Sequence, residues 1–170
     1  MTMSDVSGGR PDLSMRLSDI VSVDRILVDA DGSRIRDKAD ALHWLSSLLA
    51  PAIGATEESI LRLLLDRERL QSTGIGDGVA IPHTAVDAAP GQAGALLLCP
   101  VGVPFEAIDG VNVSIVFGVV GPKRATGEHL RTLARISRLL RDPATRSRLV
   151  GSASAEAAYA LIHAQDTLAP

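Results

Sequence analysis

The segment from Gln71 to Val86, QSTGIGDGVAIPHTAV, constrains the fold more than any other part of this chain. Its glycines alternate with other residues and predict a tight loop, because glycine adopts backbone angles that a Cβ forbids. A short apolar run follows and stops at Pro82, which cannot donate a hydrogen bond within a central strand. We therefore expect His83 to be held rigidly at the end of a strand. The three glycines are Gly74, Gly76 and Gly78.

Two interpretations of this loop remain open from the sequence. In one, backbone N–H groups converge on an anion, and the hydroxyls of Ser72 and Thr73 add further donors. In the other, the loop is a tight hairpin around Asp77-Gly78. The G-x-G-x-G spacing matches neither the Walker pattern nor the dinucleotide-binding pattern. In the first interpretation the phosphate-binding loop consists of Ser72, Thr73, Gly74, Gly76 and Gly78.

The remaining sequence alternates between predicted strands and predicted helices. This alternation indicates an α/β sandwich with a single domain over residues 16–166, and we expect residues 1–15 to be a disordered tail. A chain of 170 residues is long enough for one buried core. Strands are expected at residues 25–28, 95–101 and 113–120, and helices at 33–50, 56–70, 126–142, 145–150 and 153–164.

Composition excludes several classes of protein. The net charge of −3 and the lack of a dense Lys/Arg tract argue against nucleic acid as the partner. Cys99 is the only cysteine, which excludes a disulfide framework and a cysteine-based zinc site, and its apolar surroundings predict a buried core residue. Neither a signal peptide nor an apolar run of about 18 residues is present, so we expect a soluble cytoplasmic protein without membrane insertion.

Arg67 interrupts an apolar helix face. At 3.6 residues per turn it lies on the same side as Ile60, Leu63 and Leu64, near the C-terminal end of its helix. One interpretation is an arginine that extends along apolar surface to reach water and complements the helix dipole. The other is an arginine directed at an anion, to which its planar guanidinium is well suited.

His129 interrupts a second apolar face, which it shares with Leu133, Ile136 and Leu140. Thr126 is the expected N-cap of this helix, so His129 lies in the first turn. Free backbone N–H groups and the helix dipole favour an anion at that position.

His83, Arg67 and His129 together predict a site for phosphoryl transfer. A neutral imidazole is a competent nucleophile near pH 7, and the reaction then needs positioning and stabilisation of charge on the phosphoryl oxygens. Arg67 and His129 can supply this without a metal. The second ring nitrogen of His83 needs an acceptor to fix the tautomer, and a backbone carbonyl is expected.

Other assignments of these side chains are weaker. A metal site formed by His83, His129 and Glu128 is disfavoured, because adjacent helix residues face different directions, and we expect no metal or other cofactor. His43 and His163 have no glycine loop or inward arginine nearby in sequence and are expected to be ordinary packed or surface residues.

Over about residues 15–165 the chain resembles the enzyme IIA domains of the phosphotransferase system (PTS), of the fructose/mannitol type, and in particular the stand-alone nitrogen-regulatory IIA proteins. The resemblance rests on four segments. They are MRLSDIVSVDRILVD, LLLDRERLQSTGIGDGVAIPHT, VPFEAIDGVNVSIVFGVV and GEHLRTLARISRLLRDP, of which the second is the most specific.

The resemblance implies a mixed sheet and a phosphohistidine phosphotransferase without metal. The histidine of the IPH motif, here His83, would accept phosphate from a phosphorylated HPr-like carrier, and Arg67 and His129 would lie at the active site. The expected further partners are proteins that this chain would bind and regulate, such as kinases or transporters. The chain departs from the family at two places. Asp77 occupies a position often held by Asn or His and is expected to add negative charge near the transfer site, and Thr84-Ala85 stands where a basic residue is common. Both departures are expected to affect efficiency more than mechanism.

Two further functions remain as alternatives. One is a protein-binding regulatory module that is not phosphorylated, although inward polar groups have little physical purpose in a pure scaffold. The other is the IIA component of a fructose/mannitol-type sugar uptake system.

Overall fold

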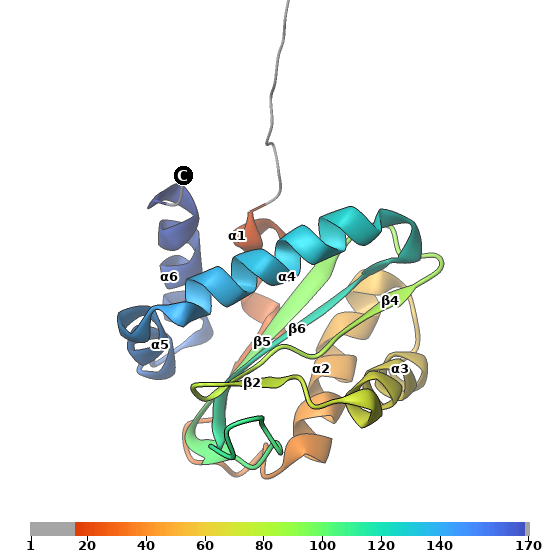
Figure 1. Ribbon diagram of the computed structural model, residues 1–170. Coiled ribbons are helices and arrows are strands. Elements are labelled where there is room, and N and C mark those ends of the chain that lie inside the picture. The colour runs from red at the N-terminus through yellow and green to blue at the C-terminus, as the bar shows by residue number, and fades with distance from the viewer. Residues whose placement is uncertain (1–15, 169–170) are drawn as a thin grey trace, which may run out of the picture.

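The computed structural model describes residues 16–168 and has helices on both faces of a central sheet (Figure 1). The predicted α/β sandwich is confirmed, and the sheet is mixed. The described helices are α1 (Leu17–Ile20), α2 (Lys38–Ile53), α3 (Glu57–Leu70), α4 (Thr126–Arg141), α5 (Pro143–Val150) and α6 (Ala155–Leu168), with short 3-10 turns at Val23–Arg25 and Lys123–Ala125. The expected disordered tail, residues 1–15, lies outside the described residues.

The sheet has the order β1-β5-β6-β3-β2. Two strands, β5 and β6, form its antiparallel centre. Because β5 occupies one edge of β6, β3 and β4 both pair with the opposite edge, one after the other along its length. The described strands are β1 (Ile26–Val28), β2 (Gly74–Gly76), β3 (Val79–Ala80), β4 (His83–Val86), β5 (Ala93–Val103) and β6 (Val113–Pro122).

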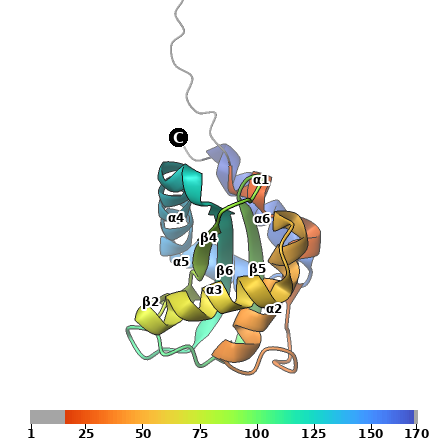
Figure 2. The ribbon, with the colours of Figure 1, turned by 90° about the vertical axis from the view of Figure 1, so that its right-hand side faces the viewer.

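The central strands are buried on both faces, as their continuous apolar sequence predicts. Successive side chains of a strand point to opposite faces. In β5, Leu97 and Cys99 pack in the cluster under α2 and α3, whereas Leu96 and Leu98 pack in the cluster under α1, α4, α5 and α6. Figure 2 shows α4 and α2 on opposite sides of the sheet. Cys99 is fully buried in the core, as expected, and this burial raises the pKa of its thiol to about 12.

Several helix boundaries differ from the prediction, among them those of α5, which begins at Pro143 rather than at residue 145, and of α6, which spans Ala155–Leu168 rather than 153–164. The first long helix begins at Lys38 rather than at residue 33, because the Asp37 side chain accepts from the Asp40 N–H and caps it there. The same helix continues past Pro51 and ends at Gly54, whose left-handed φ of 77° forms the C-cap. Ala125 is the N-cap of α4, and the Thr126 hydroxyl donates to the Lys123 carbonyl instead.

The predicted N-cap of α3 is confirmed. The Thr56 hydroxyl accepts from the Ser59 N–H at 3.1 Å, and this places Arg67 in the last turn of the helix. Within residues 16–168, none of the helices combines the length and apolarity needed to cross a membrane.

Candidate functional site

His83 is the first residue of β4 and pairs with Val119 of β6. Its Nδ1 lies 2.7 Å from the Ile81 carbonyl oxygen. A carbonyl only accepts hydrogen bonds, so Nδ1 carries the proton and Nε2 retains its lone pair. The expectation that a backbone carbonyl fixes the tautomer is therefore confirmed. Pro82, between the two partners, restricts the backbone that holds the ring in this orientation.

The His129 ring lies beside the His83 ring, with a centroid separation of 5.8 Å and an interplanar angle of 49°. The first turn of α4 supplies it, so residues 46 apart in sequence meet across β6. Its Nδ1 is buried and has no hydrogen-bond partner within residues 16–168. Gly121 lies beside the same nitrogen, and a Cβ at that position would lie 3.4 Å from it, an ordinary van der Waals contact.

Arg67 reaches the site from the end of α3. Its side chain is half-buried, and Nη1 donates to the Gln71 carbonyl at 3.0 Å. This bond uses one of five N–H donors and holds the guanidinium over the C-terminal end of its own helix. The guanidinium is close enough to His83 for its positive charge to lower the pKa of that imidazole.

Both imidazoles have a pKa below the usual histidine value. For His83 the main cause is burial, followed by the charge of Arg67; the hydrogen bond to Ile81 and the negative charge of Glu68 act in the opposite direction. For His129 the causes are burial and the neighbouring His83. Both rings are therefore neutral at pH 7, which is the form a nucleophilic imidazole requires.

The glycine segment forms a hairpin. Strands β2 and β3 pair antiparallel, and the turn between them has positive φ angles of 58° at Asp77 and 77° at Gly78. Val79 pairs with Ile115 of β6 and His83 with Val119, so four residues of β6, about 13 Å, separate the turn end of the hairpin from His83. The hairpin interpretation is confirmed for this segment.

The geometry corrects the prediction of a phosphate-binding loop made of Ser72, Thr73, Gly74, Gly76 and Gly78. The Ser72 hydroxyl donates to the Phe105 carbonyl, and the Thr73 hydroxyl donates to Glu68 Oε1 at 2.6 Å. Each hydroxyl has a single proton, so neither is free to bind phosphate. The Gly74 N–H is also used, by the Ser72 hydroxyl oxygen at 3.1 Å, while Gly76 and Gly78 lie towards the distant turn.

Asp77 is also far from the proposed chemistry. It lies in the hairpin turn, where its N–H donates to Asp109 at 3.0 Å. The charged groups that shift the pKa of His83 are Arg67 and Glu68. The expectation that Asp77 adds negative charge at the transfer site is therefore wrong.

Sequence reasoning missed Glu68, whose side chain is almost completely buried beside Arg67. Its carboxylate accepts from the Thr73 N–H and hydroxyl and forms an ion pair of 3.1 Å with Lys38 Nζ. The helical spacing of Ile60, Leu64 and Glu68 places all three on one face, and these are the buried residues of α3. That four-residue spacing could have identified Glu68 as an inward carboxylate.

Three other residues were considered from the sequence: His43, His163 and Glu128. His43 and His163 are exposed, as is Glu128. Within residues 16–168, no three His, Cys, Asp or Glu side chains lie close enough together to hold a metal ion.

Comparison with known proteins identifies the family. Residues 20–165 match the sequence model of the family described as phosphoenolpyruvate-dependent sugar phosphotransferase system, EIIA 2. A nitrogen regulatory protein of Bradyrhizobium diazoefficiens is 34% identical over 148 residues, which cover 87% of this chain and 95% of the relative. The mannitol-specific phosphotransferase enzyme IIA component of Staphylococcus aureus is 30% identical over 143 residues, 82% of this chain and 92% of that protein.

Solved structures agree with this relationship. The crystal structure of nitrogen regulatory protein IIA-Ntr from Neisseria meningitidis superposes with a TM-score of 0.79 at 30% identity, over 86% of this chain and 98% of that one. Nitrogen regulatory proteins thus occur both among the sequence relatives and among the similar solved structures. The chain therefore belongs to the EIIA type 2 family of the phosphoenolpyruvate-dependent sugar phosphotransferase system.

Proposed function

We propose that the protein accepts a phosphoryl group on Nε2 of His83 from a phosphorylated HPr-like carrier. The observation that carries this proposal is the fixed ring of His83. Its Nδ1 proton is held by the Ile81 carbonyl, so the Nε2 lone pair is available beside His129 and Arg67. The carrier, as an imidazole-bound phosphoryl donor, matches the histidine acceptor in chemistry.

The step is an in-line displacement at phosphorus. The lone pair on Nε2 of His83 forms the new N–P bond as the N–P bond on the carrier breaks, and the carrier imidazole leaves with that electron pair. Arg67 stabilises negative charge on the phosphoryl oxygens, and an N–H of neutral His129 donates to one of them. The proton of His83 stays on Nδ1 throughout and is donated in the hydrogen bond to the Ile81 carbonyl.

Regulation is the output we propose for the phosphorylated state. A phosphoryl group adds a charge of about −1.5 to −2 beside the two rings and changes the contacts available to partner proteins. Nitrogen regulatory proteins are among the relatives, which favours regulation as the main role. The alternative of sugar uptake has support from the mannitol-specific relative.

The test is the mass of the intact protein after incubation with phosphoenolpyruvate, enzyme I and the HPr-like carrier. We expect one phosphoryl group per chain in the wild type and none in His83→Ala. A phosphoryl adduct that survives in His83→Ala assigns the acceptor elsewhere. Absence of any adduct with an active carrier supports a binding module that is not phosphorylated.

A further inference from the structure

The basic residues of this protein are concentrated in one segment. Residues 123–148 contain eight of the 17 lysines and arginines but only two of the 20 acidic residues, Glu128 and Asp142. The segment has a formal charge of +6, whereas the rest of the chain has −9. It comprises all of α4 and most of α5, so one side of the molecule is strongly basic in an otherwise acidic protein.

A row of arginines follows one face of α4. Arg131, Arg135 and Arg138 are spaced i, i+4 and i+7, which places their side chains along one stripe of the helix. None of the three forms a hydrogen bond or an ion pair with another residue in the described part of the chain. By contrast, Arg69 on α3 pairs with Asp66 at 2.9 Å.

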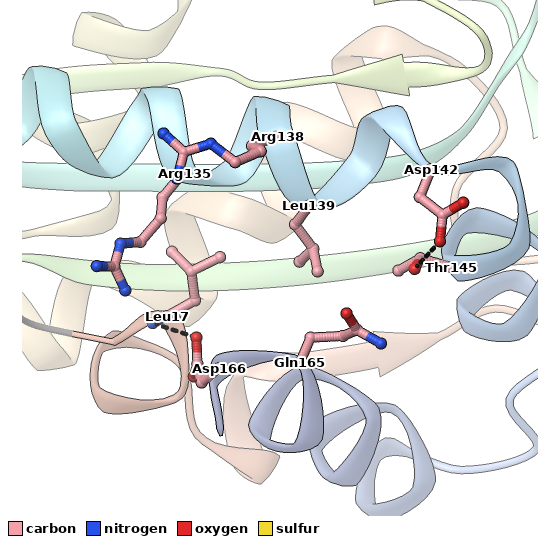
Figure 3. A pocket seen from close by; sticks show the side chains of 8 residues that line it. All are labelled: Leu17, Arg135, Arg138, Leu139, Asp142, Thr145, Gln165 and Asp166. Atoms are coloured by element: carbon pink, nitrogen blue, oxygen red, sulfur yellow. Dashed lines mark hydrogen bonds between the residues drawn. The ribbon is translucent and has the colours of Figure 1, made fainter. Parts of the chain in front are cut away.

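A small pocket lies beside this row, between α1, α4, α5 and α6 (Figure 3). Leu17 and Leu139 form its apolar part, and Arg135 extends from α4 towards Leu17. The volume is about 150 Å³, below the roughly 300–1,000 Å³ of typical small-molecule sites, so it suits a single apolar side chain.

The acidic residues of the pocket are already hydrogen-bonded. Asp142 accepts from the Thr145 hydroxyl at 2.8 Å. Asp166 accepts from the Leu17 N–H at 3.2 Å and from the Ser18 N–H at 2.8 Å, and thereby ties the end of α6 to α1. These carboxylates stabilise the walls of the pocket, and neither forms an ion pair with Arg135 or Arg138.

From this arrangement we propose that the arginine face of α4 is a docking surface for an acidic amphipathic helix of a partner protein. Carboxylates of that helix pair with Arg131, Arg135 and Arg138, and one apolar side chain enters the pocket beside Leu17 and Leu139. The surface lies along the helix from His129, so this inference goes beyond phosphoryl acceptance at His83.

Charge and spacing favour a helix over nucleic acid. Nucleic-acid-binding domains are usually basic overall, whereas this protein has a net charge of −3, and its 2% aromatic content offers little stacking surface for bases. The three arginines span seven residues, about 10 Å of helix axis. Carboxylates at i, i+4 and i+7 on an opposing helix match that span and its periodicity.

The first experiment uses a synthetic helical peptide of about 16 residues as the probe, a length at which an alanine-rich helix forms. It carries glutamates at i, i+4 and i+7 and one leucine on the adjacent face. A control peptide has the same composition with the glutamates distributed around the helix, and a second replaces the leucine with serine. We expect fluorescence anisotropy to show tighter binding of the first peptide than of either control, with an affinity that decreases as salt rises.

Matched protein variants locate the binding. Arg135→Gln/Arg138→Gln removes two charges from the proposed surface, and Arg62→Gln/Arg69→Gln removes two from α3. We expect about tenfold weaker peptide binding in the first variant, equivalent to about 1.4 kcal/mol, and no change in the second. Amide chemical shifts should move at Leu17, Leu139 and Gln165 when the peptide is added to the wild-type protein.

Three results overturn this inference. They are equal affinity for the matched and redistributed peptides, equal affinity in the two double variants, and tighter binding of a DNA duplex than of the peptide. None of these measurements depends on phosphorylation. The arginine face and the role of His83 can therefore fail separately.

Discussion

Glu68 is buried and His129 is half-buried; both are polar side chains near His83, and their surroundings are opposite. The Glu68 carboxylate accepts two hydrogen bonds from Thr73 and pairs with Lys38. The buried Nδ1 of His129 has no partner within residues 16–168. A buried polar group without a partner costs free energy, so it persists where a ligand or a reaction uses it. The comparison separates a polar cluster that stabilises the fold from one that is available for chemistry.

The two clusters share the end of α3. The charge of Arg67 acts on His83, whereas the next residue, Glu68, pairs with Lys38 and accepts a hydrogen bond from the Thr73 hydroxyl. The negative charge of Glu68 raises the pKa of His83, while the positive charge of Arg67 lowers it. The hydrogen-bonded cluster of Glu68, Thr73 and Lys38 thus fixes the helix end from which Arg67 extends. Substitutions on either side should affect different measurements.

The largest expected effect on stability is at Glu68. Glu68→Ala leaves the Thr73 N–H and hydroxyl without their acceptor, while Lys38 keeps Glu106 as an ion-pair partner at 2.8 Å. Loss of the hydrogen-bond partner of a buried group costs about 1–3 kcal/mol. We expect urea denaturation to show a decrease of that size. Glu58→Ala, an exposed change in the first turn of the same helix, is the control and should cost less than about 1 kcal/mol. Equal losses in the two variants would remove the distinction between the clusters.

The next effect is on the rate of phosphorylation, at Arg67. Arg67→Gln removes the guanidinium whose charge acts on His83, and we expect the rate of phosphoryl acceptance to fall by about 10²–10³, as for other preorganised charge-stabilising donors. Stability should change little, because within residues 16–168 the only hydrogen bond lost is that to the Gln71 carbonyl at the helix end. Arg69→Gln, two residues away and exposed, should leave the rate unchanged.

The stability and the phosphorylation rate of Arg67→Gln distinguish a structural role from a role in transfer. If the stability of Arg67→Gln falls as much as that of Glu68→Ala, Arg67 belongs to the structural cluster and the comparison is wrong. If the rate alone falls, the guanidinium acts on the transferred group.

The sequence predicted the backbone of this site better than its polar contacts. Pro82 correctly marked the end of the strand formed by the apolar run, but His83 begins the next strand, β4, rather than ending the strand before it. Helical projection correctly turned Arg67 and His129 inward, because it depends on local periodicity. The role of Thr73 could not be read in the same way. Its hydroxyl is used by Glu68, which is itself held by Lys38, thirty residues earlier in the chain.

The glycine loop illustrates a second limit. A pattern of alternating glycines permits both a hairpin and an anion-binding loop, since both need positive φ angles. The pairing of β3 with Ile115 and of β4 with Val119 decides the matter by placing the turn away from His83. That register depends on contacts with β6, which is distant in sequence.

A third substitution tests the unsatisfied nitrogen directly. His129→Leu removes the N–H proposed to contact the phosphoryl group, so we expect phosphoryl acceptance to be about 10–100-fold slower, the value of one hydrogen bond to a charged group. Unfolding in urea should change by less than about 1 kcal/mol, because the buried Nδ1 has no hydrogen bond to lose. His43→Leu, at an exposed position, is the control for both measurements.

The opposite pattern at His129 would be informative. A large loss of stability with an unchanged rate would mean that the ring packs the fold and takes no part in transfer. In that case His129 would be a structural residue like Glu68, and the contrast between the two side chains would be wrong.

The smallest effect concerns the dependence of stability on pH. Burial lowers the pKa of both His83 and His129 in the folded protein, so the unfolded chain binds more protons between the folded pKa and the unfolded value of about 6.5. Stability should therefore rise with pH through this window and fall as the pH decreases from 7 towards the folded pKa values. Solvent screens both half-exposed rings, which keeps the change modest. The measurement is the free energy of unfolding in urea at several pH values, for wild type and for His83→Gln/His129→Gln.

Subtracting the stability profile of the variant from that of the wild type removes the contribution of carboxylates, such as Glu106 and Asp109. The lowered pKa values of these carboxylates cause a separate loss of stability in more acidic solution. A difference that shrinks as the pH falls below 6.5 indicates that the folded protein keeps its rings neutral by burial. A difference that stays constant across the window, or that grows as the pH falls, would mean that both rings titrate as in the unfolded chain or are stabilised in their charged form, and that the contrast with Glu68 does not extend to protonation.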